Sequence, residues 1–284
     1  MEHITGPFRG VEALANGLVR KHGLRTKYLA IFPGVYVTKS ATPTFRQRSA
    51  AAWLWSQRRA VLAGLTAARL HGAKWVDDTA PIELISPNGR PPAGIRTYQE
   101  QLHDSEYGLR ARLPATTVSR TAYDIGRRGG LLDAVAHLDA LGNATGVTAA
   151  EVSAVASAHP GARGLRQLSQ ALVLYDSGAQ SPRETWLRLL VIDAGFPPPE
   201  TQIPVFVGGR AKYYLDMGWP DMKVALEYEG DHHRTDRAQF ARDIARLDEL
   251  IALGWTVIRV AAGTPVHAVI GRLQQAWGSA PKLR

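Results

Sequence analysis

Apolar residues at the start of the chain switch from helical to strand spacing. The stretch 11–19 has helical spacing, Gly23 interrupts it, and a second short helix is expected over 24–30. From Ile31 to Val37, apolar residues flank a Pro-Gly pair, which predicts a tight strand–turn–strand. Two helices followed by a hairpin is the order of a winged helix. We therefore expect a winged helix-turn-helix module over 1–45; the alternative is a small helical cap.

The following segment, 46–176, alternates between helical and strand patterns. Apolar spacing is helical from Thr44 to Gly72, short strands broken by Pro and Gly follow over 81–114, and helical spacing returns over 116–142. Two further helices are expected at 148–157, with Thr148 as N-cap, and at 164–175. The pattern predicts a mixed α/β middle domain without a catalytic signature, and 176–179 has the composition of a linker.

The C-terminal third begins with a helix whose start is marked by three residues. Ser181 has the N-cap residue type, Pro182 occupies N1, and Glu184 stands at N3, which together form a capping box. Capping alone is therefore a sufficient structural reason for Glu184. The apolar face of this helix comprises Leu187, Leu190 and Val191.

Four strands and two helices complete the predicted C-terminal domain, 181–284. Residues 203–207 and 212–217 flank a Gly-Gly turn and form a hairpin, and a third strand follows over 223–229. An amphipathic helix is then expected over 237–253, with Gly254 as its C′ residue, before a buried strand at 256–260 and a last helix from Thr264. The residues of the amphipathic helix expected to face inward are Phe240, Ile244, Leu247 and Ile251.

Net charge is concentrated at one end of the chain. The sequence has 34 Lys+Arg against 25 Asp+Glu, and the whole excess of +9 lies within residues 1–70. Clustered basic residues suit a polyanion because phosphate neutralisation releases counterions. The alternative is a generally basic surface. The candidates for DNA contact lie on or beside the second predicted helix and after the hairpin: Arg20, Lys21, Arg25, Lys27 and Lys39.

Composition excludes several protein classes. The chain has 284 residues and is 45% hydrophobic, which is typical of a globular protein with about two domains. It has no Cys, which excludes disulfides, thiolate zinc sites and cysteine nucleophiles. It also lacks a run of about 18 apolar residues and a basic N-terminal stretch followed by an apolar core. We therefore expect a cytoplasmic protein without a membrane span.

Three carboxylates on adjacent strands are the strongest candidates for chemistry. Glu227 and Glu229 face the same side of the third strand, about 7 Å apart, so they repel each other unless a cation compensates. Asp216 on the neighbouring strand supplies a third oxygen, and hard oxygen ligands favour Mg²⁺ or Mn²⁺. His232 and His233 follow directly and are candidates for proton transfer to or from a phosphodiester.

Arginines offer an alternative explanation for the same carboxylates. Arg234, Arg237 or Arg242 would compensate the two glutamates as ion-pair partners. On the amphipathic helix, Arg242, Asp243 and Arg246 share one surface, where they either approach a DNA phosphate or pair with each other. Arg234 and Arg242 are accordingly also candidates for contacts to nucleic acid.

Residues 181–260 resemble the very-short-patch-repair-like branch of the PD-(D/E)XK nuclease superfamily. The resemblance is carried by Ser-Pro-Arg-Glu-Thr, Tyr-Leu-Asp-Met-Gly-Trp-Pro, Val-Ala-Leu-Glu-Tyr-Glu-Gly with Asp-His-His-Arg, Arg-Asp-Ile-Ala-Arg-Leu and Gly-Trp-Thr-Val-Ile-Arg-Val. It implies an α/β (α+β) domain with a central mixed sheet flanked by helices. It also implies a metal site at Glu184, Asp216 and Glu227, with His233 as acid/base. Glu229 stands where the superfamily pattern has Lys.

The N-terminal part, 5–145, resembles the winged-helix antitoxin of AbiE-type (type IV) toxin–antitoxin systems. The matching segments are Gly-Pro-Phe-Arg-Gly, Ile-Phe-Pro-Gly-Val-Tyr-Val, Val-Leu-Ala-Gly-Leu-Thr-Ala-Ala-Arg-Leu-His-Gly-Ala and Ser-Arg-Thr-Ala-Tyr-Asp. In that family the winged helix binds its own promoter, and the following domain opposes a nucleotidyltransferase toxin. Such antitoxins normally end without a nuclease-like domain.

Two functions are therefore expected and compared. The first is a metal-dependent endonuclease that the basic N-terminal module holds on double-stranded DNA. The second is a transcriptional autorepressor and antitoxin with a non-catalytic nuclease-like domain and a cognate nucleotidyltransferase toxin as partner. A homodimer suits either function because winged helices often bind paired half-sites.

Overall fold

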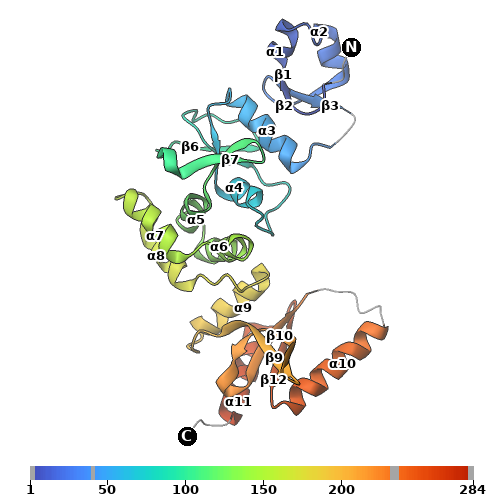
Figure 1. Ribbon diagram of the computed structural model, residues 1–284, viewed down its shortest axis with the longest axis vertical. Helices are drawn as coiled ribbons and strands as arrows, with labels where there is room; N and C mark the ends of the chain where they lie inside the picture. The colour runs from blue at the N-terminus through green and yellow to red at the C-terminus, as the bar shows by residue number, and fades with distance from the viewer. Residues whose placement is uncertain (1–3, 40–41, 231–236, 281–284) are drawn as a thin grey trace. The chain divides into compact units, whose positions relative to one another are not determined.

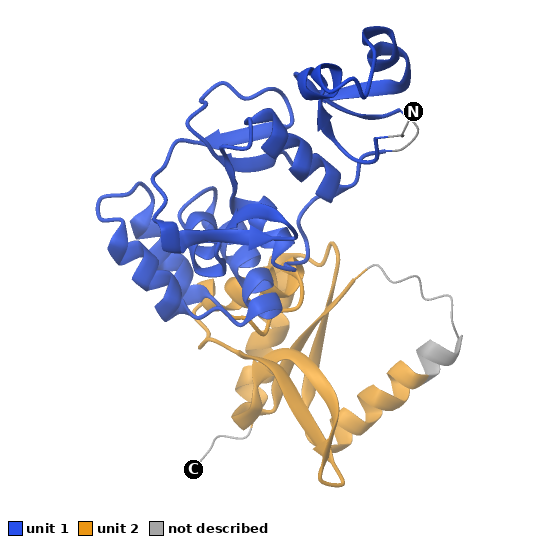
Figure 2. Cartoon of the chain, turned by 45° about the horizontal axis from the view of Figure 1, so that its top comes forward, with its two compact units in different colours: residues 1–175 blue, residues 176–284 orange. Residues whose placement is uncertain are grey.

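The protein is described by a computed structural model covering residues 4–39, 42–230 and 237–280. Its chain divides into two compact units, 1–175 and 176–284, shown in different colours in Figure 2. Both units combine helices with strands, so the molecule belongs to the mixed α/β class expected from the sequence (Figure 1). Within the described residues, no helix is both long and apolar enough to cross a lipid bilayer.

Unit 1 starts with two short helices and a small sheet. The elements are β1 (Phe8–Arg9), α1 (Gly10–Ala15), α2 (Lys21–Lys27), β2 (Tyr28–Phe32) and β3 (Val35–Thr38), and the antiparallel sheet has the order β1-β3-β2. The predicted helix break at Gly23 is wrong, because Gly23 lies inside α2. The chain instead turns after α1 at Gly17, which has a φ of 67°. Val19 and Leu24 then join the core of this segment.

A five-stranded sheet forms the centre of unit 1. It has the order β6-β5-β4-β8-β7, and its elements are α3 (Phe45–Trp55), β4 (Val61–Leu62), α4 (Gly64–Leu70), β5 (Ile82–Ile85), β6 (Ile95–Tyr98), η1 (Asp104–Glu106), β7 (Tyr107–Arg110) and β8 (Leu113–Thr116). The continuous helical pattern predicted from Thr44 to Gly72 is therefore wrong. Gln57 and Arg58 both have positive φ, which ends α3 and allows the chain to enter β4.

Four helices complete unit 1: α5 (Val118–Gly126), α6 (Leu131–Thr145), α7 (Ala149–Ala158) and α8 (Leu165–Leu174). The predicted helical stretch 116–142 is two helices, separated at Gly129, which has a φ of 71°. The predicted N-cap of α7 is confirmed, because Thr148 accepts a hydrogen bond from the Glu151 N–H at 3.3 Å.

Unit 2 is a four-stranded sheet covered by helices on both faces (Figure 1). Its elements are α9 (Pro182–Asp193), β9 (Glu200–Val207), β10 (Arg210–Trp219), η2 (Pro220–Met222), β11 (Val224–Glu229), α10 (Arg237–Ala252), β12 (Thr256–Ala261) and α11 (Val266–Ser279). The order is β12-β11-β10-β9, in which β11 and β12 are parallel and the other pairs antiparallel. Side chains of α9 and α11 pack in one core cluster, while Leu250 of α10 packs in another.

The inward face of α10 differs from the predicted face. Ile244 and Ile251 are 47% and 57% exposed, whereas Leu250 is fully buried against the sheet. Leu250 packs in one cluster with Leu253 and Trp255, which follow the last residue of α10. The side chain of Phe240 lies outside the described residues. Gly254 has a φ of 85° and ends the helix as predicted.

Candidate metal and phosphate site

Asp216 lies on strand β10 between two residues, Leu215 and Met217, whose side chains pack in different core clusters. Leu215 packs in the cluster that contains Leu250, while Met217 packs in the cluster that contains α9 and α11. On the adjacent strand, Ile203 pairs with Leu215 and Thr201 with Met217, and the intervening Gln202 has a φ of 51°. The backbone irregularity thus lies opposite Asp216. Such outliers are frequent at functional sites.

The carboxyl group of Asp216 is largely buried among other acids. Its pKa is raised from 3.8 to about 6, first by burial and in addition by the nearby carboxylates of Glu184 and Glu227. The Tyr228 N–H, which donates to Oδ2 at 2.9 Å, and Arg246 act in the opposite direction. Three elements therefore bring three carboxylates into electrostatic contact: the strand pattern had placed Asp216 beside Glu227, and the nuclease resemblance had implied Glu184.

Glu184 forms one half of the predicted capping box at the N-terminus of α9, and its charge acts on Asp216. It is 9% exposed, and its backbone N–H donates to Ser181 Oγ at 3.2 Å. Its carboxylate accepts from the Ser181 hydroxyl at 2.9 Å and from the Gln180 N–H at 2.8 Å. The backbone N–H that donates to the Glu184 carboxylate is therefore that of Gln180, the residue before the N-cap Ser181. These contacts fix the carboxylate at the helix N-terminus, where the helix dipole favours negative charge.

Glu227 is engaged by an arginine of α10. Arg246 Nη1 donates to Oε2 at 3.0 Å, Nη2 donates to Oε1, and Nη2 also donates to the Tyr214 carbonyl at 3.1 Å. Glu229 pairs with Arg259 of β12. The sequence offered ion pairs with arginine as one explanation for Glu227 and Glu229, and named other arginines as the partners. In the structure, Arg246 pairs with Glu227 and Arg259 pairs with Glu229.

A cavity of about 210 Å³ opens beside these carboxylates. Its lining combines acids, guanidinium groups and one aromatic ring: Asp216, Glu227, Tyr228, Glu229, Asp243, Arg246, Leu247 and Arg259. Arg242 is exposed on α10. His232, His233 and Arg234 lie outside the described residues. The cavity therefore offers both anionic groups for a cation and guanidinium groups for a phosphate.

The fit of this site to a divalent cation depends on Arg246. In the part of the chain that the structure describes, one group of side chains has all its potential ligand atoms within 4.8 Å of one another, and that group is His103, Glu106 and His159. Glu184, Asp216 and Glu227 are more widely spaced. Both oxygens of Glu227 accept hydrogen bonds from Arg246, so a metal ion held by Asp216 and Glu227 would share this carboxylate with the arginine or displace the arginine.

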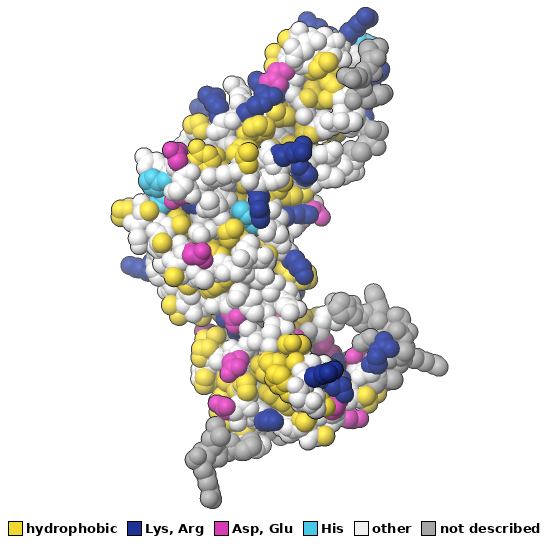
Figure 3. Space-filling model, in the orientation of Figure 1, with side chains coloured by type: hydrophobic (Ala, Val, Ile, Leu, Met, Phe, Trp, Pro, Cys, Tyr) yellow, Lys and Arg dark blue, Asp and Glu magenta, His cyan; other side chains and the backbone are white. Residues whose placement is uncertain are grey.

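The five basic residues predicted to contact DNA are all exposed in the N-terminal segment of unit 1. Lys39 connects to α2 through two bonds: its Nζ donates to the Arg25 carbonyl at 2.9 Å and its N–H donates to the Lys27 carbonyl at 3.2 Å. Arg25, Lys27 and Lys39 consequently lie side by side. Figure 3 shows basic side chains on the surface of these N-terminal elements.

A buried charged network in unit 1 was not predicted from the sequence. Arg120 is 1% exposed and pairs with Glu106 at 2.6 Å, Glu100 at 3.1 Å and Asp124 at 3.3 Å. The available signal was the i,i+4 spacing of Arg120 and Asp124 in an otherwise apolar helix. Because an unpaired charge is costly inside a protein, such a pair predicts further partners.

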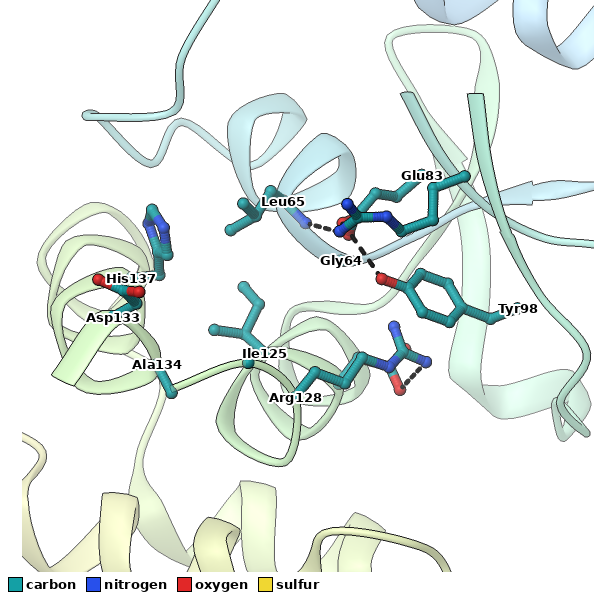
Figure 4. Close-up of a pocket in the computed structure, with 12 residues that line it drawn as sticks. Gly64, Leu65, Glu83, Tyr98, Ile125, Arg128, Asp133, Ala134 and His137 are labelled. Atoms are coloured by element: carbon teal, nitrogen blue, oxygen red, sulfur yellow. Dashed lines mark hydrogen bonds and ion pairs between the residues drawn. The ribbon is translucent and has the colours of Figure 1, made fainter. Parts of the chain in front are cut away.

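A cavity of about 290 Å³ in unit 1 was also not predicted (Figure 4). Glu83 lies at its wall, 7% exposed, and accepts hydrogen bonds from the Leu65 N–H at 3.0 Å and the Tyr98 hydroxyl at 3.2 Å. Arg128 stacks over the Tyr98 ring at 3.6 Å. Burial lowers the pKa of His137, which also lines the cavity, so this imidazole is neutral at pH 7.

Comparison with known proteins identifies relatives in mycobacteria. No protein-family model matches the chain. Two matching relatives are the uncharacterized protein Rv2248 of Mycobacterium tuberculosis strain ATCC 25618 / H37Rv and the uncharacterized protein MT2308 of strain CDC 1551 / Oshkosh. The chain is 31% identical to each over 232 residues, which cover 81% of this chain and 84% of each relative. The crystal structure of the RV2827C protein from Mycobacterium tuberculosis is similar with a TM-score of 0.43 and 17% identity, covering 71% of this chain and 84% of that chain.

Proposed function

Because the chain belongs to the family of the Mycobacterium tuberculosis protein Rv2248, whose name states no activity, we propose a function from the site itself: a metal-dependent endonuclease that hydrolyses phosphodiester bonds of double-stranded DNA. One observation carries this proposal. Asp216 is buried beside Glu184 and Glu227, whose charges both raise its pKa. Carboxylates gathered in this way attract a divalent cation, and the chain contains no Cys that would favour a softer metal.

Asp216 and Glu227 would hold Mg²⁺ or Mn²⁺, with Glu184 beside them. When bound, the ion neutralises charge on the phosphate and activates a water molecule. Arg246 would pass from Glu227 to a non-bridging phosphate oxygen, because a guanidinium group matches either anion equally well. Arg259, paired with Glu229, would add positive charge at the same cavity. His233 remains the proposed acid/base.

The rest of the molecule would hold the DNA. We propose that 1–45 is a winged helix and that unit 2 has a PD-(D/E)XK nuclease fold. The support is the two helices and three-stranded sheet of the first segment and the mixed sheet between helices of the second. Arg20, Lys21, Arg25, Lys27 and Lys39 would contact the backbone of the duplex, aided by Arg242 and Arg234. The proposed setting is the cytoplasm.

The proposal is tested by replacing one carboxylate without changing its shape. The wild-type chain, Asp216→Asn and the control Asp193→Asn, an exposed residue at the end of α9, are incubated with supercoiled plasmid in Mg²⁺ or Mn²⁺. We expect nicking by the wild-type and control chains and none by Asp216→Asn, with equal retardation of DNA on a gel. Equal cleavage by Asp216→Asn would refute the site.

A second candidate function is favoured by the Arg246–Glu227 contact. Both oxygens of Glu227 are already engaged, which is also how a nuclease-like domain without catalysis would be stabilised. In that case the protein is a DNA-binding autorepressor and antitoxin, with a nucleotidyltransferase toxin as partner and a homodimer on paired half-sites. It predicts specific retardation of DNA from upstream of its own operon, no cleavage in any metal, and neutralisation of a co-expressed neighbouring toxin.

A further inference from the structure

A second group of metal-ligating side chains lies in unit 1 and shares no residue with the proposed nuclease. His103 directly precedes the turn η1, Glu106 is the last residue of that turn, and His159 follows the last residue of α7. One ligand atom from each of the three residues lies within 4.8 Å of the other two. The fold thus brings two distant parts of the sequence to one point.

Contacts to one oxygen of Glu106 leave its other oxygen directed at the imidazoles. Arg120 Nη1 donates to Oε2 at 2.6 Å, and the backbone N–H of His103 donates to the same oxygen at 3.1 Å. The other oxygen, Oε1, lies 2.5 Å from His159 Nε2. Glu106 is only 5% exposed, so this orientation is fixed by packing as well as by hydrogen bonds. Partners that orient a ligating carboxylate in this way raise the affinity of a metal site.

The two histidines flank this oxygen and differ in exposure. Their ring centroids are 5.0 Å apart, with planes inclined by 42°. His103 is exposed and His159 is half-buried, so an ion can enter from the side of His103. Ligand atoms around a tetrahedral zinc ion are roughly 3.3 Å apart, given bonds of about 2.0–2.1 Å. His159 Nε2 and Glu106 Oε1 therefore need to separate by less than about 1 Å to bind one ion.

The arginine beside this group is neutralised by other acids. Arg120 pairs with Asp124 at 3.3 Å and with Glu100 at 3.1 Å, in addition to Glu106. Its Nη1 also lies 3.3 Å from His159 Nε2, a contact that a metal ion bound to this nitrogen would replace. Glu100 and Asp124 in turn pair with Arg127 and Arg128. The three arginines and three carboxylates of this network have no net charge. A cation bound at Glu106 Oε1 consequently meets no excess of positive charge.

We propose that His103, Glu106 and His159 bind one Zn²⁺ ion. Two imidazole nitrogens and one carboxylate oxygen are a frequent zinc ligand set, with a water molecule in the fourth position. Mg²⁺ is a poorer fit because it prefers an octahedron of oxygens. The ion would tie the C-terminal end of α7 to the turn that leads into β7, and so join the helices of unit 1 to its sheet.

The test compares zinc binding by the metal-free, full-length chain and by three variants. Zn²⁺ is titrated calorimetrically into the wild-type chain, His103→Ala, His159→Gln and the control His22→Ala, which removes an exposed imidazole from α2 of the same unit. We expect one zinc ion to bind the wild-type and His22→Ala chains with equal affinity. His103→Ala and His159→Gln should each weaken this binding by about tenfold or more.

His103 is exposed, so His103→Ala should keep the fold, and circular dichroism in EDTA verifies this. A second measurement locates the ion: with Co²⁺ in place of Zn²⁺, visible absorption of a four-coordinate site should appear in the wild-type chain and disappear in His103→Ala. Absence of zinc binding by the wild-type chain, or equal affinity in His103→Ala, would overturn the proposal.

Discussion

Asp216 is the residue whose ionisation opposes folding most directly. Its pKa rises from 3.8 to about 6 on folding, so ionisation costs the folded state more than the unfolded state. The contribution of the protonated Asp216 carboxyl group to the free energy of unfolding is fully present below 3.8, the pKa of the unfolded state. It is lost as the pH rises through about 6. The shift of roughly two pKa units sets an upper limit of about 3 kcal/mol on this cost at pH 8.

We expect Asp216→Asn to stabilise the metal-free chain, because Asn keeps the hydrogen bond from the Tyr228 N–H and has no charge to bury. The gain in free energy of unfolding should be about 1–3 kcal/mol at pH 8 and should shrink towards zero near pH 4. Urea unfolding in EDTA at both pH values measures it. An Asn variant that is less stable than the wild-type chain at pH 8 would contradict this assignment of the raised pKa.

Glu227 and Arg246 form the ion pair on which the proposed metal site depends. Glu227→Ala would leave a partly buried guanidinium without its carboxylate, at a cost of about 1–3 kcal/mol in the free energy of unfolding. Glu249→Ala, which removes the partner of Lys212 from the same helix, should have a much smaller effect because that pair is exposed. Urea unfolding of both variants tests the difference. Equal losses would show that the Glu227 pair contributes no more than a surface ion pair.

At the scale of single elements, helix α4 begins at a glycine that no other residue replaces easily. Gly64 has a φ of 52°, and a Cβ at this position would lie 1.8 Å from Glu83 Oε2. Gly64→Ala should therefore lower the free energy of unfolding by about 1–3 kcal/mol. Gly271→Ala is the control, since it lies in the middle of α11 in open space and should gain about 0.5–1 kcal/mol. Thermal unfolding that ranks the two variants in the reverse order would contradict the packing around Glu83.

Local signals predicted the elements that local chemistry determines. The caps at Thr148 and Ser181, the hairpin around Gly208 and the helix end at Gly254 all depend on residues within one turn of the feature. Elements that depend on distant partners were predicted less well. Gly23 is helical because Leu24 is buried against Tyr28, and the strand β4 exists because β5 and β8 pair with it on either side.

In the candidate site too, the features set by neighbouring residues were predicted and those set by distant partners were not. Alternation along β11 placed Glu227 and Glu229 on one face, and the hairpin placed Asp216 beside them. The sequence could not show that Arg246 would reach Glu227, because this depends on how α10 packs across the sheet. It also could not show His103, Glu106 and His159 together, because their contact requires both the sheet and the helices of unit 1 to be complete.

At the scale of the whole molecule, the charge excess at the N-terminus predicts how DNA binding depends on salt. Each lost phosphate contact should reduce the slope of log affinity against log salt concentration by about one. Arg25→Gln combined with Lys39→Gln should therefore reduce the slope by about two, since both side chains are exposed beside α2. Arg166→Gln, an exposed residue of α8, should leave the slope unchanged. Fluorescence anisotropy with a short duplex measures it, and an unchanged slope in the double variant would remove these residues from the interface.

The carboxylates of unit 2 are proposed to bind a metal ion that DNA cleavage requires, so the decisive measurement is plasmid nicking with and without metal. The wild-type chain and Glu227→Gln, which retains a carbonyl oxygen as an acceptor for Arg246, are compared in EDTA and after Mg²⁺ or Mn²⁺ is added back, at concentrations that retard the plasmid equally. The proposed metal site predicts nicking by the wild-type chain only when metal is present, and none by Glu227→Gln. Nicking that persists in EDTA or in Glu227→Gln, or its absence from the wild-type chain in every metal, would contradict it.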